Sequence, residues 1–213
     1  MGRRALRKID PTLDLSRHLK TWDELPRPWD AAAWFGRNAP LEVEVGSGKG
    51  LFLYAAATNG PAHDFLGVEI AQKYARFAAA RLARAGLANA LVLNANAERL
   101  FSELLPTASL AAVHVYFPDP WWKKRHHKRR VMNDRFLRNV ERTLSTGGAF
   151  HFWTDVREYF DATLALIAAE TSLAGPLQVA ERPAAHNLDY RTHFERRTRL
   201  GGDSVYRAEF RKP

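Results

Sequence analysis

The stretch from residue 113 to residue 130 combines an acid, two prolines, two tryptophans and a dense run of cations. A run from Val113 to Phe117 with β character leads to Asp119, which stands between two prolines. Prolines on both sides restrict the backbone around this carboxylate. The eight residues 123–130 comprise six Lys or Arg and two His. A fixed acid beside stacking aromatics and a cationic run indicates chemistry on a nucleic-acid base.

A glycine-rich turn over residues 46–50 is the second chemical element. Three glycines alternate there, after a β-rich run over 41–45 and before an apolar segment. Glycine permits a tight turn and close approach to a ligand, and the following helix N-terminus adds a favourable dipole. The spacing is not that of a P-loop, because Lys49 is followed by glycine rather than Ser or Thr. It also matches a dinucleotide loop poorly, since the third glycine would fall at Leu51.

Polar side chains stand at the ends of three successive predicted strands. Glu44 lies near the end of the first, Glu69 at the end of the second, and Asn96 after the third. The carboxyl ends of parallel strands share one edge of a sheet, where ligands bind in open α/β folds. Glu69 can accept hydrogen bonds from both ribose hydroxyls, and Asn96 can reach an adenine edge. Two acids and an amide favour a cationic cofactor with an adenosine group, such as S-adenosylmethionine.

The elements that must position these residues alternate between strands and helices. Alternation of this kind predicts a mostly parallel sheet with helices on both faces, and the last two strands, with no helix between them, predict an antiparallel edge. We expect a basic N-terminal arm over residues 1–35, with a short helix near its end, and one domain over 36–213. The predicted strands are 41–45, 64–70, 90–93, 113–117, 149–153, 177–181 and 205–211, and the predicted helices are 29–35, 51–58, 72–85, 133–144 and 156–170.

Composition narrows the class of protein further. The 213 residues carry a formal net charge of +9 and a pI of about 10.1, which favours a polyanionic partner, nucleic acid first. There are no cysteines, so disulfides and thiol nucleophiles are excluded. No H-E-x-x-H or similar spacing predicts a metal site, and no apolar run is long enough to span a membrane. The N-terminal residues lack the apolar region of a secretory signal, so we expect a cytoplasmic protein.

These motifs together resemble the tRNA (guanine-N7)-methyltransferases, a family of class I S-adenosylmethionine-dependent enzymes, in its bacterial single-subunit form. The resemblance runs from about residue 40 to the C-terminus, and the P-D-P-W block with its basic tail is its most specific part. It implies a Rossmann-like, mostly parallel seven-stranded sheet with an antiparallel edge strand. The matching segments are 41–50, 65–70, 96–97, 116–130, 147–155 and 192–195.

The resemblance also implies roles for individual residues. Asp119 would border cofactor and target base as the catalytic residue. The cofactor would be bound by Glu44, Gly46, Gly48, Glu69, Asn96 and Asp119. The substrate nucleoside would contact Lys123, Asp155, Thr192, His193, Phe194 and Glu195. The RNA would be gripped by Arg125, His126, His127, Lys128, Arg129 and Arg130. The family often has Asp where Asn96 stands, and Trp122 receives no role.

The implied reaction moves a methyl group from S-adenosylmethionine to N7 of a guanine in the variable loop of tRNA. Guanine N7 carries a lone pair and no proton, so no general base is required, and alignment of the reactants dominates catalysis. Two other readings stay open at this point: a methyltransferase for another RNA or a small molecule, and a non-catalytic RNA-binding module with a vestigial cofactor pocket. We expect tRNA as partner, no metal and no membrane, and either a monomer or a homodimer.

Overall fold

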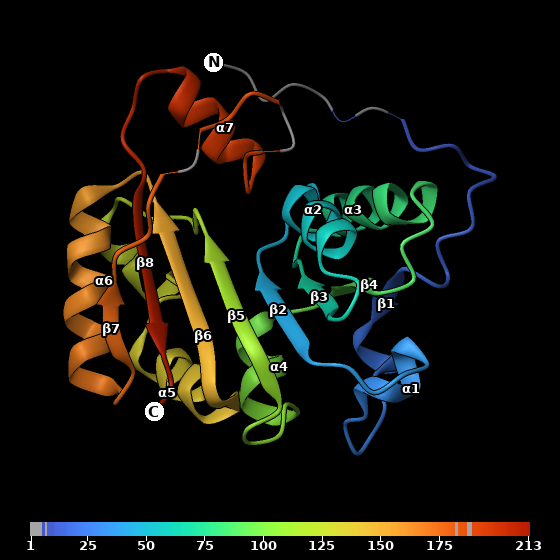
Figure 1. Cartoon of the computed structure of the whole chain (residues 1–213), viewed down its shortest axis with the longest axis horizontal. Coiled ribbons are helices and arrows are strands. Elements are labelled where there is room, and N and C mark those ends of the chain that lie inside the picture. Colours follow the sequence, from blue (N-terminus) through green and yellow to red (C-terminus); the bar gives the residue numbers. More distant parts are fainter. Residues whose placement is uncertain (1–5, 7, 182, 187–188) are drawn as a thin grey trace.

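The computed structural model describes residues 6, 8–181, 183–186 and 189–213. An eight-stranded sheet runs through them in the order β1-β4-β3-β2-β5-β6-β8-β7 (Figure 1). The strands from β1 to β6 in this order are parallel, and β8 runs antiparallel to both β6 and β7. The strands are β1 (Leu19–Thr21), β2 (Leu41–Val45), β3 (Asp64–Val68), β4 (Ala90–Asn94), β5 (Leu110–Tyr116), β6 (Leu144–Thr154), β7 (Ala174–Leu177) and β8 (Tyr206–Arg211).

The predicted fold class is confirmed, and three details of the sheet differ from the prediction. The sheet has an eighth strand, β1, because three residues of the N-terminal region pair with β4. The antiparallel strand β8 is not at the edge but lies one place inside it, since β7 pairs with its outer side. The strand expected at 177–181 is found at Ala174–Leu177 instead. All four of its residues are exposed, so no alternation of buried side chains marks it in the sequence.

Helices cover both faces of the sheet. Contacts join α2 to α3 and both of them to β4, while α5 contacts α4, α6 and β6, and Figure 1 shows α6 lying along the β6–β8–β7 part of the sheet. The 3-10 helices are η1 (Trp22–Glu24) and η2 (Lys124–Arg129). The α-helices are α1 (Ala31–Phe35), α2 (Leu51–Asn59), α3 (Gln72–Arg84), α4 (Ala97–Glu103), α5 (Asp134–Thr143), α6 (Arg157–Glu170) and α7 (His193–Leu200).

Helix α5 illustrates how the sequence sets these elements. Its N-cap, Asn133, accepts a hydrogen bond from the backbone N–H of Phe136 at 2.9 Å. Phe136, Leu137 and Val140 recur on one face of the helix and are buried in the largest core cluster. Burying a side chain of this size contributes about 2 kcal/mol. The apolar stripe therefore both forms the helix and fixes it against the sheet.

Successive residues of the central strands point to opposite faces and so belong to different clusters. Leu66 and Val68 join the large cluster with α4 and α5, whereas Phe65 and Val92 join a second cluster with α2 and α3. The sheet is thus buried on both sides along β3 and β4. Its parallel strands bring their carboxyl ends to one edge, above which α7 lies (Figure 1).

The N-terminal region packs onto the same body. Trp22, Trp29 and Trp34 are partly buried against the large cluster. Arg37 ties the chain before β2 to the buried Asp64, with its Nε 2.8 Å from Oδ1. Residues from 19 onward therefore share the core of the sheet, while the division into an arm and a domain at residue 35 stays a prediction.

Candidate active site

Five predicted site residues stand at the carboxyl ends of five neighbouring parallel strands. In the spatial order β4, β3, β2, β5 and β6 they are Asn96, Glu69, Glu44, Asp119 and Asp155. The chain turns from β2 outward to β3 and β4, and later returns to place β5 on the other side of β2. Such a topological switch point is where open α/β sheets bind ligands. The edge therefore brings together acids that lie more than a hundred residues apart in sequence.

The glycine loop leaves open space at one position and close packing at another. Gly46 has φ +79°, and a Cβ added there would meet nothing within 4 Å. Gly50, with φ +66°, caps α2, and its added Cβ would lie 2.7 Å from the Ala78 side chain on α3. Gly50 thus lets two helices approach, whereas Gly46 leaves room above the strand end for a ligand.

Glu69 organises this loop through backbone hydrogen bonds. Its Oε2 accepts from the Gly48 N–H at 2.9 Å, and its Oε1 accepts from the Ala71 N–H at 2.8 Å. Asn94 holds the same turn from β4, because its Nδ2 donates to the Glu69 carbonyl at 2.8 Å. Each carboxylate oxygen has a second lone pair, so Glu69 can also accept from a ligand hydroxyl.

Glu44 is a buried carboxyl beside that turn. It is 2% exposed, and its Oε2 has no hydrogen-bond partner among the described residues. Burial, with a further effect of the Glu69 charge, raises the pKa of Glu44 well above its ordinary range. An unpaired buried carboxyl next to a second acid is costly unless a cation or donor meets it. The two carboxylates fit the positively charged cofactor predicted from the sequence.

Asn96 lies at the same edge but serves first as a helix cap. The residue is exposed, and its Oδ1 accepts from the Arg99 backbone N–H at 3.4 Å at the start of α4. A cap of this kind leaves the amide donors of the side chain available. Its predicted contact with adenine stays a prediction.

Asp119 is exposed at the end of β5, directly beside the β2 end that carries Glu44. Phe117 and Trp121 flank it with positive φ values of 52° and 45°, which are uncommon for aromatic residues. Arg130 secures the turn, since its Nε donates to the Pro120 carbonyl at 2.7 Å. The bent backbone and this bond hold Asp119 toward solvent at the edge rather than against the core.

Arg130 rests in turn on an aromatic ring. Its guanidinium carbon lies 4.7 Å from the ring centroid of the buried Tyr159 on α6. Burial, with a smaller effect of the Asp119 charge, raises the pKa of Tyr159 to about 12, so the phenol is neutral. The sequence predicts Arg130 as an RNA contact, whereas the structure also ties it to the Asp119 turn.

The cationic run forms the short helix η2 next to this turn. Lys123 is its N-cap, and the side chains of Arg125, His127 and Lys128 are exposed. The guanidinium carbon of Arg129 lies 5.1 Å from the Trp121 ring centroid. A cation stacked on an indole leaves its N–H groups free for a phosphate. His126 meets the same indole edge to face, with centroids 5.8 Å apart.

Helix α7 carries the predicted substrate residues 192–195 and splits them into two groups. Thr192 caps the helix, with its Oγ1 accepting from the Glu195 N–H at 3.0 Å. His193 and Phe194 are exposed, and the Phe194 ring lies 5.3 Å from that of Phe117, next to the Asp119 turn. Phe194 therefore lies beside the Asp119 turn, His193 contacts Arg81 of α3, and Thr192 caps the helix.

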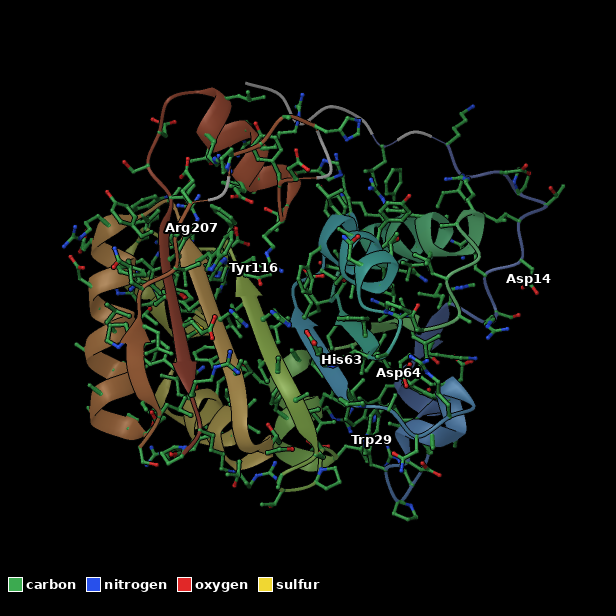
Figure 2. All side chains as sticks on the ribbon, viewed as in Figure 1. Asp14, Trp29, His63, Asp64, Tyr116 and Arg207 are labelled. Atoms are coloured by element: carbon green, nitrogen blue, oxygen red, sulfur yellow. The ribbon has the colours of Figure 1, made fainter. Side chains whose placement is uncertain are left out.

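Glu195 is 3% exposed and is held by two arginines. Its Oε1 lies 3.3 Å from Arg199 Nη1 and 3.3 Å from Arg207 Nη2, and its Oε2 accepts from the Arg191 N–H at 2.6 Å. Figure 2 shows Arg207 at the start of β8, near Tyr116 at the end of β5. This arrangement supports a positioning role for Glu195, which locks α7 onto the sheet.

Sequence reasoning missed the residues that build this support. Arg207 and Arg191 stack on the same Trp153 ring, at 5.1 and 5.7 Å, and Asn94 braces the Glu69 turn. None of the three stands in a motif, because their partners come from distant strands. Nothing in the sequence singles out Arg207, because Arg207, Glu209 and Arg211 all occupy the polar positions of an alternating strand.

Among the described residues, no group of three or more His, Asp or Glu could hold a metal ion. Likewise, no helix in the described part of the chain is long and apolar enough to cross a bilayer.

Comparisons with known proteins identify the kind of fold that carries this site. Residues 38–208 match the model of a family described as putative methyltransferases. A solved 16S rRNA methyltransferase, KamB, superposes with a TM-score of 0.61 at 21% identity, covering 86% of this chain and 94% of that one. A solved antibiotic-related methyltransferase gives the same TM-score of 0.61 at 16% identity, over 83% and 90% of the two chains. The protein therefore has the Rossmann-like fold of the class I methyltransferases.

Relatives by sequence narrow the class to one family. The chain is 50% identical to the tRNA (guanine-N(7)-)-methyltransferase of Rhodopirellula baltica, over 100% of this chain and 80% of that protein. It is 32% identical to the protein of the same name from Aeromonas hydrophila, over 98% of this chain and 85% of that one. The chain belongs to the tRNA (guanine-N(7)-)-methyltransferase family, which confirms the resemblance drawn from its motifs.

Proposed function

We propose that this protein transfers a methyl group from S-adenosylmethionine to N7 of a guanine in tRNA. The observation that carries the proposal is the exposed Asp119 at the end of β5, beside the buried Glu44 at the end of β2. One acid faces outward, where a base can reach it, and the other faces the glycine loop. The relatives that share this chain over its whole length carry the same activity in their names.

Glu44, Glu69 and the glycine loop would hold the cofactor. Glu69 would accept from its hydroxyl groups, and Glu44 would meet positive charge, since its Oε2 is buried and unpartnered among the described residues. The open space at Gly46 would admit the ligand close to the backbone. When bound, S-adenosylmethionine supplies an electrophilic methyl carbon on a sulfonium that departs as a neutral thioether.

Asp119 would orient the guanine and stabilise the charge that it gains. The N7 lone pair attacks without loss of a proton, so the chain needs no general base. Positive charge then develops on the purine ring, and a nearby carboxylate stabilises it. The same carboxylate can accept from the guanine N1–H and N2 amino groups. Arg130 keeps it in place through Pro120, and the exposed Phe194 and Asp155 border the space where the base would lie.

The cations of residues 123–130 would bind the RNA backbone. Arg129 on Trp121, and the exposed Arg125 and Lys128, suit phosphate contacts that carry no sequence information. Family resemblance points to the variable-loop guanine as the target. A cytoplasmic location follows from the tRNA substrate. We also propose an N-terminal arm over 1–35 ahead of the methyltransferase domain, and a monomer or homodimer.

Incubation with bulk tRNA and S-adenosylmethionine labelled in its methyl group tests the proposal. We expect label only in 7-methylguanosine after digestion to nucleosides. Unmodified transcripts that differ at one variable-loop guanine should show where the label enters. Label in another nucleoside would point to a different RNA methyltransferase, and cofactor binding without label in any RNA would remove the proposed activity.

A further inference from the structure

The strand ends that carry Asn96, Glu69, Glu44, Asp119 and Asp155 are here called the transfer edge. A cavity of about 610 Å³ has none of these five residues in its lining. Three of its lining residues, Phe77, Arg81 and Arg84, are spaced four and three residues apart along α3 and share one helix face. Tyr54 of α2 and Lys8 of the N-terminal region complete the wall. Its wall therefore brings two aromatic rings and three cations together from three segments: the N-terminal region, α2 and α3.

The charge of this cavity is not balanced by its own walls, because none of the described residues that line it carries a carboxylate. The charge of Arg84 acts on Asp10, whose Oδ1 already accepts from the Thr12 N–H at 2.9 Å and from the Thr12 hydroxyl at 2.7 Å. Arg81 is half-buried, and its Nη2 lies 3.0 Å from the Nε2 of His193. Partial burial and the charges of Arg81 and Lys49 lower the pKa of His193 to about 4, so this partner is neutral near pH 7.

A path of contacts connects this cavity to the transfer edge. Arg81 meets His193 at the first turn of α7, and the next residue, Phe194, packs on Phe117 beside the Asp119 turn. Lys49 of the glycine loop also acts on His193 through its charge. An RNA strand with its target base at Asp119 could therefore continue past α7 toward α3.

We propose that this cavity is a second RNA subsite, in which Lys8 and Arg84 hold a phosphodiester and Tyr54 or Phe77 stacks on the base of the same nucleotide. The proposal rests on the proposed function, because the RNA is the tRNA substrate. Cations beside aromatic rings are the combination that binds nucleotides without reading their sequence. This subsite would grip a nucleotide away from the methylated guanine and so add length to the RNA footprint.

Salt-dependent binding of tRNA, measured without cofactor, tests the subsite. The double variant Lys8→Ala/Arg84→Ala removes two exposed cations that have no part in the transfer edge. We expect the slope of log affinity against log salt to fall in magnitude by about one to two. The matched control is Arg138→Ala on α5, an exposed arginine paired with Asp134 and Glu170, which should leave the slope unchanged.

A separate variant tests whether an aromatic ring of the cavity stacks on a base. Tyr54→Leu keeps an apolar side chain but removes the flat ring, and we expect tRNA affinity to fall about fivefold or more with the slope retained. Cofactor affinity, measured by calorimetry, should be unchanged in every variant. Thermal denaturation checks that each variant is folded, and the single variant Arg84→Ala replaces the double one if the latter unfolds.

The outcomes separate this proposal from the proposed function. If the wild-type protein methylates tRNA but Lys8→Ala/Arg84→Ala binds it as Arg138→Ala does, the subsite is rejected and the function stands. If the wild-type protein binds no tRNA, both are rejected. In the last experiment, inorganic phosphate or guanosine monophosphate is added to the wild-type protein and to the double variant, and thermal stability is measured. If they stabilise the wild-type protein alone while tRNA binding is the same in both, the cavity binds a free anion and the RNA assignment fails.

Discussion

The two halves of the carboxyl edge are held together by different interactions. On the β2–β3–β4 side, carboxylates and amides bond to backbone groups of their own turn or of a neighbouring strand end, as Glu69 does with Ala71 and Gly48. On the β5–β6–β8 side, arginines stack on aromatic rings and also form hydrogen bonds, as Arg130 does with Tyr159 and Pro120. The first half is held by hydrogen bonds from side chains to the backbone, and the second half mainly by arginines that lie on aromatic rings.

This difference matches what each half would bind in the proposed function. A cationic cofactor would be met by buried acids, and Glu44 and Glu69 are both buried. A polyanionic RNA would be met by exposed cations, and the run at 123–130 carries several. Asp119 lies where the two meet, as an acid at the border of a basic surface. Charge of opposite sign is thus sorted along one edge of the sheet.

The largest effect should come from removing the acid at that border. Asp119→Ala should lower single-turnover methylation at least tenfold, about 1.4 kcal/mol of barrier, with tRNA affinity nearly kept. The cause is the loss of charge stabilisation and base orientation. Asp119→Asn is the matched control, because it keeps an acceptor without the charge. Turnover equal to wild type in the alanine variant would remove Asp119 from the mechanism.

A smaller effect should distinguish the adjacent arginines Arg129 and Arg130. Arg130→Ala breaks a charged hydrogen bond to Pro120, so we expect turnover to fall by up to about tenfold with little change in the salt slope. Arg129→Ala leaves that turn intact and should reduce the magnitude of the salt slope of tRNA binding by about one. Single-turnover rates and binding isotherms over a salt series measure the two separately. Identical behaviour of both variants would refute the distinction.

A third effect concerns pH and the β2–β3–β4 half of the edge. Because the pKa of Glu44 is raised, a falling pH protonates this buried carboxyl before the exposed acids. A cationic ligand prefers the ionised form, so affinity for S-adenosylmethionine should rise with pH, by at most about tenfold per unit for one proton. Calorimetry from about pH 5 to about pH 8 checks this. Glu44→Gln should flatten the profile, and an unchanged profile in that variant would assign the pH dependence elsewhere.

The sequence predicts the elements of the β2–β3–β4 half well because they follow one another along the chain. Strand, glycine turn and helix follow one another over 41–59, and Glu69 needs only the next strand to reach the loop. The parallel strands and long helices are found near their predicted positions for the same reason. Helix α4 escaped prediction because it is seven residues long and depends on the Asn96 cap.

For the β5–β6–β8 half, the sequence predicts which types of residue gather there but not how they contact one another. Residues 193–200 are short, charged and rich in arginine, and they become α7 because Thr192 caps them and Arg207 binds Glu195 from β8. A cationic run likewise does not reveal which member is tied inward. Arg130 differs from Arg129 through Pro120 and Tyr159, and the Tyr159 contact lies far along the chain.

The placement of β8 between β6 and β7 has a consequence for how the protein is made. Strand β7 is synthesised before β8, and β8 is its pairing partner among the described strands. Arg207, which lies in β8, also binds Glu195 of α7. A nascent chain can therefore assemble its cofactor-side strands early. The helix α7 and the edge strand β7 can be fixed in place only after β8, which ends at Arg211, has been synthesised.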